Sequence, residues 1–113
     1  MTDTTTPEAI GRTYAKLVLG DVLAPHDRQR LTTWLLANTT SENRFRAGLP
    51  EGWTLADKTG TGDYGTTNDV GVAWTADRTP IVLSVLSTKR QADAPSDDPL
   101  LAKTAALLVP ALT

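Results

Sequence analysis

The chain has 113 residues, a length that limits it to a single domain or part of one. Eleven basic and thirteen acidic residues give a net charge of −2, and because these charges are scattered, no nucleic-acid partner is expected. With no cysteine and one histidine, disulfide frameworks, thiolate nucleophiles and histidine-rich or cysteine-based metal sites are excluded, so no metal site is expected.

The first residues contain neither a basic nor an apolar stretch, so we expect no signal peptide. The longest wholly apolar run is far shorter than the roughly 20 residues that cross a bilayer, so no membrane segment or membrane partner is expected. The sequence gives no localisation.

Two helices that form a hairpin are predicted in the first third of the chain. The first begins after Thr6, a capping residue, with Pro7 in its first turn, and ends at Gly20. The second begins near Pro25 and ends at Asn38. Their apolar stripes consist of Ile10, Tyr14, Leu17 and Val18 in the first helix and Leu31, Trp34 and Leu35 in the second.

Beyond residue 52 the apolar residues alternate, which predicts β-strands. We expect strands over 53–60, 70–74 and 81–86, with Gly60, Gly62 and Gly65 breaking the pattern between the first two. The third run is rich in β-formers and apolar on both faces, so it is predicted to be the central strand.

Helical segments complete the predicted fold. A short helical turn is expected around 44–47, and a last helix begins at Asp98, with Pro110 expected to fray or kink it. Short links between the strands favour an antiparallel meander with the helices against one face, an α+β fold. We expect one unit over 1–113, with residues 1–52 helical and residues 53–113 forming the sheet and the C-terminal helix.

One segment matches a cofactor-binding pattern by its letters alone. Residues 60–65 fit G-x-G-x-x-G, but the dinucleotide fingerprint needs a helix to open within it, and here a strand is predicted to follow. We therefore expect no cofactor.

The segment Lys58-Thr59-Gly60 has the chemistry of a carboxylate-binding edge. The lysine supplies a positive charge and the threonine hydroxyl a hydrogen bond, while the glycine lets a ligand lie close to the strand. The alternative interpretation is an exposed strand end without a ligand.

K-T-G is one of the motifs of class A β-lactamases and penicillin-binding proteins. Four segments, residues 5–7, 31–34, 46–53 and 56–62, resemble the C-terminal part of class A β-lactamases in order and spacing. Arg44 is similar to the arginine that actinobacterial-type members place beside the lysine. The resemblance covers nearly all of this chain but only about the last two-fifths of a typical family member.

The resemblance implies roles for five residues at a substrate cleft. Lys58 and Thr59 would hold the carboxylate of a β-lactam, with Arg44 supporting that charge. Gly60 would lie against the ligand, and the backbone N–H of Thr61 would supply half of an oxyanion hole.

Two further residues are implied to support the site from below. Strand alternation turns Asp57 away from the face of Lys58, and the resemblance suggests that Arg46 pairs with it. An unpaired buried carboxylate would be costly, so this pair is predicted to stabilise the fold.

The family hydrolyses the β-lactam amide through a serine in S-x-x-K, a serine in S-D-N and a glutamate in the Ω-loop. None of the four serines of this chain has a lysine three residues later, and the resemblance places that glutamate before residue 1. Loss of the nucleophile and base lowers the rate by orders of magnitude. We expect no catalytic residue in this chain, which alone should be inactive.

Three interpretations remain open: part of a class A β-lactamase, a non-catalytic interaction domain with the same half-fold, or part of a penicillin-binding protein or D-alanyl-D-alanine peptidase. The resemblance implies that the edge at 81–86 would be exposed, and exposed edges recruit partners. The expected partners are a β-lactam once the missing part is supplied, and a complementary N-terminal fragment or a second copy.

Overall fold

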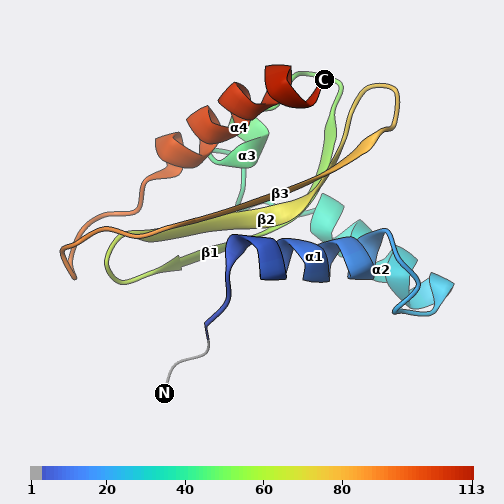
Figure 1. Ribbon diagram of the computed structural model, residues 1–113, viewed down its shortest axis with the longest axis horizontal. Helices are drawn as coiled ribbons and strands as arrows, with labels where there is room; N and C mark the ends of the chain where they lie inside the picture. The colour runs from blue at the N-terminus through green and yellow to red at the C-terminus, as the bar shows by residue number, and fades with distance from the viewer. Residues whose placement is uncertain (1–3) are drawn as a thin grey trace.

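The computed structural model describes residues 4–113 and contains an antiparallel sheet in the order β1-β2-β3 (Figure 1). The predicted α+β fold, with two N-terminal helices, three strands and a C-terminal helix on the sheet, is confirmed. None of the helices in the described range is long and apolar enough to span a membrane. The elements are α1 (Pro7–Val18), α2 (Pro25–Leu36), α3 (Phe45–Gly48), β1 (Thr54–Gly62), β2 (Thr66–Trp74), β3 (Pro80–Ser87) and α4 (Asp98–Leu112).

Helices cover both faces of the sheet, and the prediction that they share one face is wrong. α1 and α2 lie on one side, and α3 and α4 lie on the other (Figure 1). Leu55 and Ala73 join the core beneath α3 and α4, whereas Ala56 and Val72 join the core beneath α1 and α2. Consecutive strand residues point to opposite faces of the sheet, so the strands carry apolar side chains on both faces. Each apolar face needs helices packed against it to be buried.

The N-terminal helices begin as predicted. The Thr6 side chain accepts a hydrogen bond from the backbone three residues later at 3.1 Å, and Pro7 opens α1. α2 begins at Pro25 and ends at Leu36, two residues before the predicted stop. Asn38 therefore lies outside the helix, where its side-chain amide contacts β1.

The hairpin between β1 and β2 is longer than the sequence predicted. Gly60 and Gly62 remain paired with β2, so the predicted break is wrong at these two glycines, whereas Gly65 lies between the strands as predicted. Extended backbone keeps its ladder of hydrogen bonds without a side chain. The turn is made instead by Tyr64 and Gly65, whose φ angles are +61° and +59°.

β3 lies at an edge of the sheet in the described range, and β2 occupies the centre. The prediction of a central third strand is therefore wrong for this chain. The apolar run is partly covered because α1 packs beside it, but Val82 keeps 38% of its surface exposed. An apolar strand at an edge leaves unpaired backbone groups available to another chain.

The C-terminal helix continues through Pro110, so the predicted kink or fraying there is wrong. A proline in the last turn of a helix removes only one late hydrogen bond. α4 packs closely on α3 because Gly48 lacks a side chain. A Cβ at that position would lie 2.0 Å from the carbonyl oxygen of Ala102.

Candidate functional site

The K-T-G segment occupies the second half of β1, which pairs with β2. Lys58 is exposed and Thr59 is partly buried. The Lys58 ammonium donates to the carbonyl oxygen of Thr59 at 2.7 Å. An ammonium group and a hydroxyl group thus come from adjacent residues of a strand whose outer edge pairs with no other strand in the described range.

Arg44 lies beneath this strand end with only 6% of its surface exposed. Its Nε donates to Asp98 Oδ1 at 2.8 Å, and its Nη1 donates to the carbonyl oxygens of Gly60 and Asn68, both at 2.9 Å. Its Nη2 donates to Thr61 Oγ1 at 2.6 Å. One side chain therefore joins β1, β2 and the start of α4.

Arg44 and Lys58 lie on opposite faces of β1. Thr61 is separated from Lys58 by an odd number of strand positions, so the two side chains point to opposite faces. Arg44 reaches Thr61 from the α3 side, while its charge is matched by Asp98. The arrangement excludes a solvated surface role for Arg44, and its action on a ligand carboxylate stays a prediction.

Asp57 is fully buried and does not pair with Arg46, so that prediction is wrong. Its Oδ1 accepts from Asn38 Nδ2 and from Ser41 Oγ, both at 3.2 Å. Arg46 is exposed, and its Nη2 donates to the carbonyl oxygen of Leu55 at 3.3 Å. Neutral donors from the segment after α2 thus occupy the position expected for the arginine.

A second buried carboxyl group, Asp69 on β2, lies against Asp57. Asp69 Oδ2 accepts from the backbone N–H of Phe45 at 3.2 Å, while Asp69 Oδ1 and Asp57 Oδ2 receive no hydrogen bond from other groups. Burial, then the hydrogen bond and negative charge of Asp57, raise the pKa of Asp69 to about 9, although Phe45 N–H and Arg44 oppose the rise. Asp69 therefore holds a proton at neutral pH and can donate it toward Asp57.

A chain of hydrogen bonds joins this buried pair to Thr59. Asn38 Nδ2 donates to the carbonyl oxygen of Asp57 at 3.0 Å, and Asn38 Oδ1 accepts from the backbone N–H and hydroxyl of Thr40 at 2.8 and 2.6 Å. The Thr40 and Thr59 hydroxyl oxygens are 2.6 Å apart. Sequence reasoning missed Asn38, Thr40 and Asp69, because each meets its partners only through the fold.

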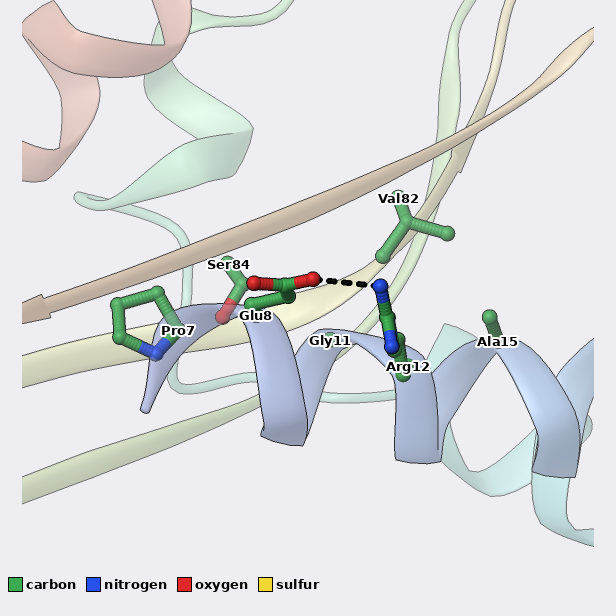
Figure 2. Close-up of a pocket in the computed structure, with 7 residues that line it drawn as sticks. All are labelled: Pro7, Glu8, Gly11, Arg12, Ala15, Val82 and Ser84. Atoms are coloured by element: carbon green, nitrogen blue, oxygen red, sulfur yellow. Dashed lines mark ion pairs between the residues drawn. The ribbon is translucent and has the colours of Figure 1, made fainter. Parts of the chain in front are cut away.

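A separate groove lies between α1 and β3, on the opposite edge of the sheet from the K-T-G strand (Figure 2). Gly11 allows the close approach, since a Cβ there would lie 3.3 Å from Ser84 Cβ. An ion pair between Glu8 and Arg12, at 2.5 Å, lies on the helix beside it. The lining residues are Pro7, Glu8, Gly11, Arg12, Ala15, Val82 and Ser84.

No metal-binding cluster is formed by the histidine and acidic side chains of residues 4–113. The K-T-G edge presents an ammonium group, hydroxyl groups and backbone N–H groups. Such groups bind anions and stabilise developing negative charge.

Comparison with known proteins identifies the family. A family model described as beta-lactamase enzyme family matches residues 1–112. Beta-lactamases of Streptomyces lavendulae and Streptomyces fradiae are 66% and 60% identical over 99% and 100% of this chain, which spans 37% of each relative. A solved beta-lactamase from Streptomyces albus G superposes with a TM-score of 0.96 at 62% identity, covering 99% of this chain and 42% of that one. The chain belongs to the beta-lactamase enzyme family, and its predicted resemblance to the C-terminal portion of a class A enzyme is confirmed.

Proposed function

We propose that this chain forms one wall of a β-lactam-binding cleft in an enzyme that hydrolyses β-lactam antibiotics. The observation that carries the proposal is the K-T-G segment on a strand edge, in a chain 66% identical to a beta-lactamase. The exposed ammonium of Lys58 and the adjacent hydroxyl of Thr59 suit a ligand carboxylate.

Three neighbouring groups complete this wall. Gly60 leaves room for a flat ligand beside the strand, and the backbone N–H of Thr61 contributes half of an oxyanion hole. Arg44 supports the carboxylate site by fixing the positions of Gly60 and Thr61 through its hydrogen bonds.

The chemical step requires groups from outside these 113 residues. The chain has no S-x-x-K motif, and acyl transfer needs an activated nucleophile with a base within hydrogen-bonding reach. We propose that the serine nucleophile and the deacylating glutamate belong to the part of the relatives that this chain does not span. The chain by itself is then inactive.

The edge opposite the K-T-G strand is where we propose that this missing part docks. β3 is unpaired on one side in the described range, and the groove beside Gly11 adjoins it (Figure 2). On α4, Leu107 exposes 78% of its surface and Leu112 exposes 46%. Apolar surface at a free strand edge favours pairing with another segment.

A chimeric enzyme tests the proposed function. The chain replaces the matching segment of the Streptomyces lavendulae beta-lactamase, and nitrocefin hydrolysis is measured for the chain alone and for the chimera. We expect the chain alone to hydrolyse nitrocefin no faster than buffer does, and the chimera to hydrolyse it clearly faster.

Two variants sharpen this test. Lys58→Ala should lower kcat/KM at least about tenfold, the scale for losing a charged hydrogen bond. Lys103→Ala, which removes an exposed lysine of α4, should have no effect. A folded chimera without turnover, or one insensitive to Lys58→Ala, would overturn the proposal.

A further inference from the structure

The hydroxyl oxygen of Thr40 lies within hydrogen-bonding distance of two other oxygen atoms. Each of these two contacts needs a proton between its oxygen atoms. Thr40 Oγ1 is 2.6 Å from Asn38 Oδ1 and 2.6 Å from Thr59 Oγ1. Hydroxyl–oxygen contacts of this length are hydrogen bonds. A hydroxyl has one proton to donate, so Thr40 donates to one neighbour at a time.

The orientation of the Asn38 amide is fixed by one group that can only accept a hydrogen bond and one that can only donate. Its nitrogen faces the carbonyl oxygen of Asp57, which only accepts, and its oxygen faces the backbone N–H of Thr40, which only donates. The amide oxygen therefore lies toward Thr40 and has no proton to offer.

This orientation sets the direction of the remaining bonds. The Thr40 hydroxyl donates to Asn38 Oδ1, so the 2.6 Å contact with Thr59 requires Thr59 to donate to Thr40. The proton of Thr59 points inward in this state, and its oxygen presents lone pairs outward. A carboxylate beside it would meet those lone pairs rather than a donor.

We propose that Thr40 is a positioning residue that reverses its hydrogen bond when an anionic ligand binds. The Thr40 hydroxyl turns from Asn38 to Thr59, and the proton of Thr59 turns outward to the carboxylate. Each proton stays on its own oxygen. The inference rests on the proposed function, because it names how that site becomes a donor.

The inner end of this hydrogen-bond chain remains satisfied throughout the change. Asn38 Oδ1 keeps the backbone N–H of Thr40 at 2.8 Å, and Asn38 Nδ2 stays on Asp57. The outer end gains strength, because a hydroxyl that accepts a hydrogen bond is a better donor. A bond to a carboxylate is also stronger than one between neutral groups.

The test uses the chimera with benzylpenicillin as substrate. Thr40→Val, which removes the hydroxyl, should raise KM and lower kcat/KM about three- to tenfold, the effect of one hydrogen bond, with kcat within about twofold. Thr40→Ser keeps the hydroxyl and should match the parent. Thr39→Val is the control, because Thr39 is exposed and takes no part in these bonds.

A double-mutant cycle separates positioning from general structural damage. In a Thr59→Val background, Thr40→Val should have no further effect, because its partner is gone. Full additivity would overturn the inference, as would an unchanged kcat/KM in Thr40→Val or an equal loss in Thr40→Ser. These results leave the proposed function intact, whereas an inactive but folded parent chimera overturns both.

Discussion

The raised pKa of Asp69 makes the stability of the chain depend on pH in an unusual direction. An aspartate has an ordinary pKa of about 3.9 in an unfolded chain, whereas the folded-state pKa of Asp69 is raised to about 9, first by burial and then by Asp57. Between these values the folded protein binds one more proton than the unfolded protein. This contribution is fully present below the unfolded pKa and is lost as the pH rises through the folded one.

The size of the effect follows from this proton. One proton changes the free energy of unfolding by about 1.4 kcal/mol per pH unit, so stability should fall by roughly 3 kcal/mol between about pH 6 and 8. Urea unfolding followed by tryptophan fluorescence measures this slope. Asp69→Asn should flatten it, because an amide does not ionise, accepts from Phe45 through its oxygen and donates to Asp57 through its nitrogen.

The exposed residue Asp93 provides a matched control. Asp93→Asn should reproduce the slope of the parent. If the parent and Asp69→Asn gave parallel plots of unfolding free energy against pH, the raised pKa of Asp69 would be refuted.

Three other substitutions test the packing around the site. Arg44→Ala should destabilise the chain by about 2 to 4 kcal/mol, because a buried cation and its bond to the partly exposed Asp98 are lost; in the chimera a kcat/KM within about twofold of the parent would remove Arg44 from the site. Gly48→Ala places a Cβ against the Ala102 carbonyl and should cost about 1 to 3 kcal/mol, so an unchanged thermal midpoint would contradict the close packing of α3 on α4. Arg46→Ala should cost less than about 1 kcal/mol, because the side chain is exposed, and a larger loss in urea unfolding would restore the abandoned pair with Asp57.

Local patterns predicted the helices and strands well because their physical causes lie within a few residues. Thr6 and Pro7 identify the start of α1, and alternation identifies β1. The same patterns failed where several elements compete for one position. Nothing near residues 81–86 reveals that two helices cover each face of the sheet and that β3 lies at an edge.

The site divides in the same way. Lys58, Thr59 and Gly60 are adjacent, so their motif is visible in the sequence. Asn38 and Thr40 each lie 19 residues from their partners on β1, and Asp69 meets Asp57 only through the register of the hairpin. The Arg46 prediction failed because a nearby arginine was assumed to neutralise a carboxylate that the neutral donors Asn38 and Ser41 accommodate instead.

The contact between Arg44 and Asp98 also restricts how this chain can evolve. The two residues are 54 positions apart, yet a substitution at either one destabilises the chain while the other residue is retained. Replacing Asp98 first leaves a buried cation without its counter-charge, and replacing Arg44 first releases the carbonyl groups of β1 and β2. Each single substitution therefore gives a less stable protein. We expect substitutions at the two positions to occur together among related sequences.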